Sequence, residues 1–253
     1  MQKDFKLRYF LEFAYNGTHY HGWQYQPNAV SVQETLNKVF STLLQEEIEI
    51  VGAGRTDTGV HASQMYGHFD TEKELDIEKL TYKANSFLPK DISIFKIIPV
   101  HHDAHARFDA TSRTYHYHIA TQKNVFNTEL AWFYHHDLDV DAMNAAAKLL
   151  LDFTDFECFS KTNTDVFTYN CKITEAYWKK ENNTLIFTIT ADRFLRNMVR
   201  AIVGTLVNIG LHKINTDDFI KIIESKSRKK AGFSVPAQGL FLTKITYPYI
   251  KQE

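Results

Sequence analysis

The 253-residue sequence has only two cysteines, Cys158 and Cys171, and no long uninterrupted apolar run. Two cysteines are too few for a disulfide framework in a chain of this size, so we expect two reduced, structural thiols. No stretch reaches the roughly 18 apolar residues that a membrane span needs. Residues 1–17 alternate polar and apolar side chains and do not form a secretory signal. The sequence therefore predicts a soluble, cytoplasmic protein with no membrane association.

The sequence also lacks the spacing of a metal site. Its 12 histidines occur mostly as close pairs, without the HExxH or cysteine-rich patterns that fix a tetrahedral zinc ion. We expect no metal. A metal hydrolase built on the histidines is the alternative, and loss of activity with a chelator would support it.

A basic excess is missing too, since the formal net charge is -1. This argues against nucleic acid as a partner. The charge is unevenly distributed, however: residues 193–230 contain nine Lys and Arg against three acids, which gives +6 for that segment. The run indicates either a positive face that attracts a polyanion or a solvated helical surface with no partner.

The first half of the chain alternates between strand and helix patterns. Alternation and turn residues predict strands at residues 7–15, 48–51, 61–69 and 92–100. Ser31-Val32-Gln33-Glu34 has the S-x-x-E form of a capping box and opens an amphipathic helix. A second helix is expected from about residue 76 to 88, stopped by Pro89.

The second half has a similar order of elements. We expect strands at 113–120 and 240–245, a hairpin that turns at Asn182-Asn183, and helices at 141–151, 193–210 and 217–223. The fold class is therefore α+β, with two sheet-and-helix lobes at residues 1–103 and 104–253.

The most unusual stretch is Gly52-Ala53-Gly54-Arg55-Thr56-Asp57-Thr58-Gly59-Val60-His61-Ala62, a loop between two apolar strands. A dinucleotide-binding G-x-G-x-x-G fails at Asp57, and no Gly-Lys-Ser/Thr ends the run as a Walker loop requires. The remaining interpretation is a glycine-rich loop that carries one carboxylate, Asp57.

Two interpretations of Asp57 remain open from the residues alone. If residues 55–57 are extended, Arg55 and Asp57 point to the same side, and the guanidinium can hold a phosphate or orient the acid. Alternatively, Asp57 only caps its own backbone in an Asx-turn between Thr56 and Thr58.

The sequence resembles the TruA family of tRNA pseudouridine synthases. Gly54 to Ala62, GRTDTGVHA, is similar to the family's signature, and the likeness spans nearly the whole chain in the expected order. The other matching motifs are Tyr15-Asn16-Gly17, Tyr20 to Gln24, Val32-Gln33-Glu34, Ala106 to Ala110, Arg113-Thr114-Tyr115, Phe194, Asn197 to Arg200, Val203-Gly204, Ala231-Gly232 and Gly239-Leu240.

The resemblance implies a pseudouridine synthase fold with a central cleft and gives roles to particular residues. Asp57 is implied to attack the target uridine or to remove a proton from its ribose, with no cofactor or metal. Arg200 is implied to be its partner, and Tyr115 to contact the target base. Arg55, Arg107 and Arg113 are implied to contact phosphates or loops.

The residues themselves leave a non-functional alternative open for two of these roles. Arg193, Arg196 and Arg200 are spaced to lie on one face of the expected helix, where they could be a solvated stripe. Tyr115 could be a strand residue that faces the core.

The resemblance further implies that the substrate is uridine at positions 38 to 40 in the anticodon stem-loop of tRNA, and that the protein is a homodimer. The near-neutral charge and Asp109 in the second motif depart from the expected pattern and leave open how tRNA docks. A non-catalytic RNA-binding module or chaperone is the alternative function, and it has no use for the Asp57 loop.

Overall fold

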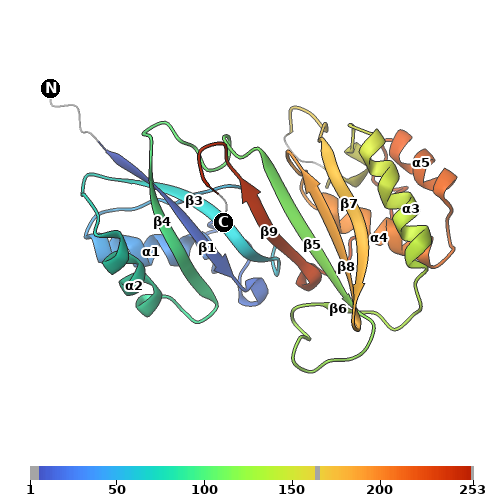
Figure 1. The fold of residues 1–253 in the computed structure, drawn as a ribbon, viewed down its shortest axis with the longest axis horizontal. Helices are drawn as coiled ribbons and strands as arrows, with labels where there is room; N and C mark the ends of the chain where they lie inside the picture. The colour runs from blue at the N-terminus through green and yellow to red at the C-terminus, as the bar shows by residue number, and fades with distance from the viewer. Residues whose placement is uncertain (1–5, 163–165, 252–253) are drawn as a thin grey trace. The chain divides into compact units, whose positions relative to one another are not determined.

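The computed structural model describes residues 6–162 and 166–251 and contains two compact units (Figure 1). The first unit runs up to Thr111 and takes in the C-terminal residues from Leu242 onward, and the second is Ser112–Phe241. The expected α+β class is confirmed. These bounds differ from the expected 1–103 and 104–253: the first unit extends to Thr111, and strand β9 (Leu240–Thr246) begins in the second unit and ends in the first.

The first unit is built on an antiparallel sheet with β1 in the middle. β1 (Leu7–Tyr15) pairs on one side with β3 (His61–Thr71) and on the other with β4 (Ile92–Val100), and the short β2 (Val51–Gly52) pairs with β3. Helices α1 (Val32–Leu44) and α2 (Ile77–Phe87) lie next to each other in this unit (Figure 1). The strands at 7–15 and 92–100 match their predicted bounds.

The predicted strand at 48–51 is wrong over most of its length. The main-chain groups of Ile48 and Ile50 bond to side chains of α1: Ser41 Oγ accepts from the Ile48 N–H at 2.9 Å, and Asn37 Oδ1 accepts from the Ile50 N–H at 2.9 Å. The Nε2 of Gln33 donates to the Ile50 carbonyl at 2.9 Å. Because the helix satisfies these groups, only Val51 and Gly52 pair with β3.

The second unit has its own antiparallel core, in which β8 lies between β5 and β7. The α-helices of this unit form one group, in which α3 contacts α4, α5 and strand β7 (Figure 1). The elements are β5 (Ser112–Ala120), β6 (Trp132–Phe133), β7 (Ile173–Glu181), β8 (Thr184–Ala191), α3 (Val140–Leu149), α4 (Met198–Gly210) and α5 (Thr216–Glu224). The predicted hairpin turn is confirmed, with Asn182 in the left-handed region at φ 52°.

Four short 3-10 helices complete the described elements: η1 (Gly17–His19), η2 (Leu150–Asp152), η3 (Glu157–Phe159) and η4 (Ala237–Gly239). None of these four short helices is predicted from the sequence. The helix expected at 141–151 therefore ends at Leu149 and continues as η2.

Helix α4 is the most buried helix, and it begins five residues later than predicted. Asn197 has φ 66°, in the left-handed region, which ends any helix arriving from Arg193. The Arg196 carbonyl accepts from the N–H of Lys161 at 3.0 Å rather than serving a helical turn. Arg193 and Arg196 therefore lie outside the helix, and the predicted one-face arrangement of these arginines with Arg200 is wrong.

Candidate active site

The aspartate loop, residues 53–60, connects β2 to β3 as predicted. Asp57 is half-buried and Arg55 is exposed. The loop closes with a turn in which the Val60 N–H donates to the Asp57 main-chain carbonyl at 3.2 Å, helped by Gly59 at φ 76°. This hydrogen bond joins main-chain atoms of Asp57 and Val60.

The end of β1 and the chain after it, residues 15–23, hold the aspartate loop in place. The Trp23 N–H donates to the Thr56 carbonyl at 3.4 Å, and the Gly59 N–H donates to the Tyr20 carbonyl at 3.3 Å. The hydroxyls of Tyr15 and Thr56 share a hydrogen bond of 2.9 Å. The loop is thus bonded on both sides of Asp57.

Close backbone approach explains two glycines in this N-terminal segment. A methyl group added to Gly17 would lie 2.0 Å from the carbonyl oxygen of Val60. The N–H of Gly17 donates to Nδ1 of buried His61 at 3.0 Å. Gly22 has φ 86°, and a methyl group there would lie 2.3 Å from the Thr56 carbonyl oxygen. Only glycine fits at these contacts.

The second unit carries Arg200, in the first turn of α4. Arg200 is half-buried, and its Nε–H donates to the main-chain carbonyl of Val235 at 2.7 Å. The Val235 N–H donates back to the Arg200 carbonyl at 3.3 Å. Arg200 is therefore anchored by its own backbone and by its guanidinium group, and is not part of a solvated stripe.

We call residues 232–236 the clamp segment, because hydrogen bonds or close contacts fix each residue in turn. The Gly232 N–H donates to Thr205 Oγ1 at 2.9 Å, and the Pro236 carbonyl accepts from the Tyr117 hydroxyl at 2.8 Å. The main chain of Phe233 presses on Gly204, where an added methyl group would lie 1.9 Å from the Phe233 oxygen. The Ser234 Oγ accepts from Asn197 Nδ2 at 2.7 Å.

Tyr115 lies on β5 opposite Ile189 and is half-buried. Its ring meets that of Phe194 edge-on, with centroids 5.1 Å apart at 87°. Tyr117 lies two residues along the same strand and so on the same face. Because Tyr117 bonds to Pro236, beside the Val235 that anchors Arg200, the second unit brings Tyr115 and Arg200 to the same side of β5.

The three remaining arginines of the prediction lie in different surroundings. Arg113 begins the β5 face that carries Tyr115, and its Nη1 donates to the Asp192 carbonyl at 2.7 Å. Arg55 and Arg107 belong to the first unit and are exposed. The guanidinium of Arg107 lies over the Phe108 ring, 5.6 Å from its centroid.

Asp109, the unexpected acid of the second motif, has a structural role. Its carboxylate accepts from the His105 N–H at 2.7 Å and from the Tyr249 hydroxyl at 2.7 Å. The His105 N–H bond is the main reason that the pKa of Asp109 is lowered. Asp109 therefore ties its own loop to the C-terminal segment of the first unit.

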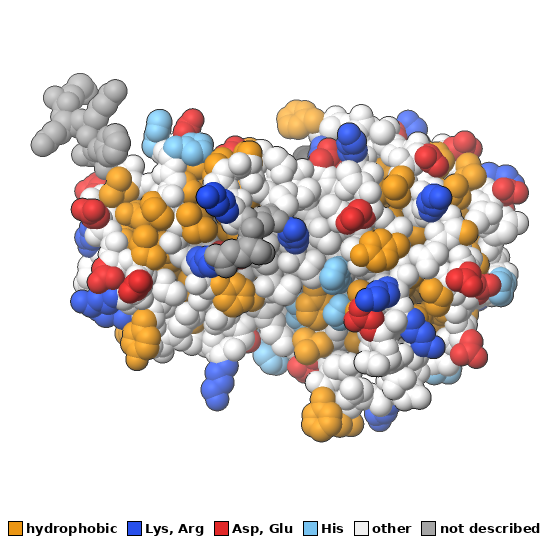
Figure 2. Space-filling model, in the orientation of Figure 1, with side chains coloured by type: hydrophobic (Ala, Val, Ile, Leu, Met, Phe, Trp, Pro, Cys, Tyr) orange, Lys and Arg blue, Asp and Glu red, His pale blue; other side chains and the backbone are white. Residues whose placement is uncertain are grey.

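Some side chains of the basic run at 193–230 are engaged in contacts within the protein. Lys226 forms an ion pair of 2.7 Å with Asp155, and Arg228 is half-buried with its guanidinium on the clamp segment. On the face shown in Figure 2, Lys and Arg side chains are interspersed with Asp and Glu. The run is thus not simply a solvated stripe, and its charge pattern does not indicate that Arg228 turns inward.

Both cysteines are buried and free, as expected for structural thiols, and burial raises the pKa of each to about 12. Within residues 6–162 and 166–251, no group of three or more His, Cys, Asp and Glu side chains is placed to hold a metal ion. No helix in the described part of the chain is long and apolar enough to cross a membrane.

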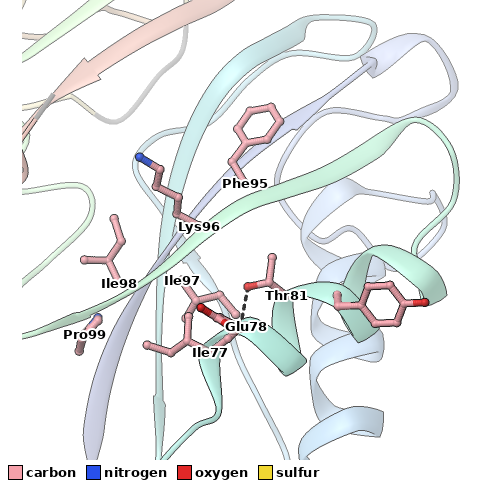
Figure 3. A pocket seen from close by; sticks show the side chains of 9 residues that line it. Ile77, Glu78, Thr81, Phe95, Lys96, Ile97, Ile98 and Pro99 are labelled. Carbon is pink, nitrogen blue, oxygen red and sulfur yellow. Dashed lines mark hydrogen bonds between the residues drawn. The ribbon is translucent and has the colours of Figure 1, made fainter. Parts of the chain in front are cut away.

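An open groove of about 520 Å³ lies on the first unit, between α2 and β4 (Figure 3). Ile77 and Ile97 contribute to its mostly apolar wall. All of its lining residues come from residues 77–82 and 95–99, so the groove is separate in sequence from the aspartate loop.

A family model and several relatives of known name resemble this chain over most of its length. The model of the tRNA pseudouridine synthase family matches residues 13–109 and 146–248. The chain is 55% identical over 243 residues to tRNA pseudouridine synthase A of Bacteroides fragilis, covering 95% of this chain and 96% of the relative. It is 52% identical over 242 residues to the protein of that name from Parabacteroides distasonis, covering 95% and 96%. With Porphyromonas gingivalis the identity is 51% over 245 residues, covering 95% and 97%. The chain belongs to the TruA family of tRNA pseudouridine synthases.

Proposed function

We propose that this chain converts uridine to pseudouridine at positions 38 to 40, in the anticodon stem-loop of tRNA. As a member of its family the chain is an isomerase that makes pseudouridine in tRNA. The observation that carries the proposal is the aspartate loop, which main-chain hydrogen bonds and close glycine contacts hold on both sides of Asp57. A single carboxylate presented from a fixed loop is what this reaction needs.

Asp57 is the proposed catalytic residue. It either attacks the target uracil or removes a proton from the ribose, and in both routes the N-glycosidic bond breaks while the enzyme holds the uracil. The ring then turns, C5 joins the ribose carbon, C5 gives up its proton to solvent, and N1 takes up a proton from solvent. In the first route the bond between Asp57 and the uracil breaks again, and in the second the ribose regains its proton. Uridine and pseudouridine have the same atoms, so neither a cofactor nor a metal is required.

The second unit supplies the proposed partners of the carboxylate. Arg200 stabilises ionised Asp57, and its fixed guanidinium suits that task because it is anchored on Val235. Tyr115 contacts the extruded base with its ring. Arg55, Arg107 and Arg113 contact phosphates of the RNA. We therefore propose that the N-terminal lobe carries the aspartate and that the C-terminal lobe completes a cleft around the nucleotide.

We propose that the enzyme acts as a homodimer in the cytoplasm, where its tRNA substrate is found. Local positive charge is sufficient for this substrate, because phosphates interact with nearby Lys and Arg within about a Debye length of 8–10 Å.

The target positions are tested with unmodified tRNA transcripts that carry uridine at 38, 39 and 40, and with transcripts in which one of the three is replaced by cytidine. We expect pseudouridine only at these positions, and loss of one product for each replacement. Modification elsewhere would contradict the proposed site, and tRNA binding without any product would favour the RNA-binding alternative.

A further inference from the structure

Arg200 depends on a main-chain carbonyl for its direction. Its Nε–H donates to Val235 at 2.7 Å, so a shift of Val235 changes where the rest of the guanidinium points. Val235 is buried in the clamp segment and has no side chain able to fix its own carbonyl. What fixes the clamp segment therefore also fixes Arg200.

Arg228 is the side chain that holds the middle of the clamp segment. It is half-buried and follows α5, just after Lys226 in the left-handed region at φ 51°. Its Nη1 donates to the Gly232 carbonyl at 2.9 Å, and its Nη2 donates to Ser234 Oγ at 2.8 Å. One guanidinium thus spans the segment on both sides of Phe233.

Ser234 links Arg228 to the start of α4. The same Oγ that accepts from Arg228 also accepts from Asn197 Nδ2 at 2.7 Å. Asn197 adopts the left-handed conformation that begins α4, three residues before Arg200. A continuous set of hydrogen bonds therefore runs from Arg228 through Ser234 to Asn197, and the neighbouring Val235 carries Arg200.

We propose that Arg228 is a positioning residue for pseudouridine formation, which holds Arg200 in its working orientation through Ser234 and Val235. This inference rests on the proposed function. It gives one member of the basic run an inward task in place of RNA contact. An arginine is needed because lysine, with one ammonium nitrogen, cannot span Gly232 and Ser234 with a planar fork.

The effect is expected to be local. The ends of the clamp segment keep their own bonds, from Gly232 to Thr205 and from Pro236 to Tyr117. Loss of Arg228 therefore loosens the middle of the segment without releasing it. A misplacement of about 1 Å in an active site can cost about 100-fold in rate.

The test measures single-turnover pseudouridine formation at saturating tRNA, and tRNA binding separately. We expect Arg228→Ala to lower the rate by about 10- to 100-fold, with the Kd for tRNA changed less than about threefold. Arg228→Lys is expected to recover part of the rate. Lys226→Ala is the matched control, since it removes a nearby cation that pairs with Asp155 outside this network, and it should keep the rate within about twofold.

A double variant, in which Arg228→Ala is combined with Arg200→Lys, separates a positioning role of Arg228 from other roles. Arg200→Lys keeps the charge but lacks the Nε–H that meets Val235, so adding Arg228→Ala to it should lower the rate by less than about threefold. An equal loss in both backgrounds, a change confined to Kd, or full activity of Arg228→Ala would each overturn the inference.

A readout that needs no turnover distinguishes failure of the inference from failure of the proposed function. If the wild-type protein makes no pseudouridine, the proposed function fails. The side-chain Nε–H signal of Arg200, followed by nuclear magnetic resonance, still reports on its anchor: faster exchange of this proton with water in Arg228→Ala than in Lys226→Ala supports the positioning role. An unchanged signal contradicts it.

Discussion

Gly22 lies directly against the backbone of Thr56, the residue before the proposed catalytic aspartate. A methyl group on Gly22 would lie 2.3 Å from the Thr56 carbonyl oxygen and 3.2 Å from the carbonyl carbon of Asp57. The same stretch of chain donates the Trp23 N–H to Thr56. The position of Asp57 is therefore set by a segment more than thirty residues away in sequence.

Gly22→Ala should displace the aspartate loop. Alanine is strained at φ 86°, and its methyl group forces Thr56 to move. We expect a loss of about 2 kcal/mol in the free energy of unfolding, measured in denaturant, and at least a tenfold loss of pseudouridine formation.

Gly54→Ala is the control for stability within the same loop. Gly54 is not among the positive-φ glycines, and apart from Gly54 and its two chain neighbours, no heavy atom of the described residues lies within 4 Å of a methyl group built there. Its free energy of unfolding should match the wild type. If Gly22→Ala proved as stable and active as the wild type, the close contact would not position the loop.

His68 should make the stability of the protein fall in mild acid. Burial is the main cause that lowers its pKa to about 4, and its Nδ1 accepts from the Ala106 N–H at 3.2 Å. An unfolded histidine has a pKa near 6.5. Between these values the unfolded chain binds more protons, so stability is fully present above about pH 6.5 and is lost as the pH falls toward 4.

The contribution of His68 is measured by comparing the wild type with His68→Gln at pH 7 and pH 4.5. We expect the wild type to lose about 2 kcal/mol more than the variant over this interval. His102→Gln, at a side chain that is 81% exposed, should follow the wild-type profile. Parallel profiles for His68→Gln and the wild type would argue against a buried neutral His68.

Cys158 and Cys171 should be unreactive in the folded protein. With a pKa raised to about 12 by burial, each thiol at pH 8 is ionised to only about one part in ten thousand. A disulfide reagent should modify neither cysteine on the time scale of free glutathione, and both once the chain is unfolded. Rapid modification of either thiol in the folded protein would contradict this burial.

Much of the fold could be predicted from local patterns. The strands at 7–15 and 92–100, the Ser31 cap, and the Asn182-Asn183 turn depend on alternation and cap chemistry, which act between near neighbours in the chain. The start of α4 could not be predicted, because the Arg196 carbonyl is taken by Lys161 from a distant part of the sequence. The strand expected at Ile48 and Ile50 is missing for a more local reason, since side chains of the preceding helix α1 bond to their main-chain groups.

The site could be predicted only in part. The roles proposed for Asp57 and Arg200 rest on the resemblance, because spacing alone leaves a loop aspartate and a basic stripe ambiguous. The clamp segment and Arg228 carry no local signature, since their meaning comes from main-chain carbonyls at Gly232 and Val235. A charge run in sequence does not reveal which cations turn inward.

The most direct test of the account is tritium release from tRNA labelled at C5 of uridine, measured in single turnover with Asp57→Asn. Asparagine keeps the size of the side chain but cannot supply a carboxylate. We predict wild-type stability, a Kd for tRNA within about threefold of the wild type, and no release above background, while Asp217→Asn on the exposed side of α5 releases tritium normally. Release by Asp57→Asn at the wild-type rate would contradict the account.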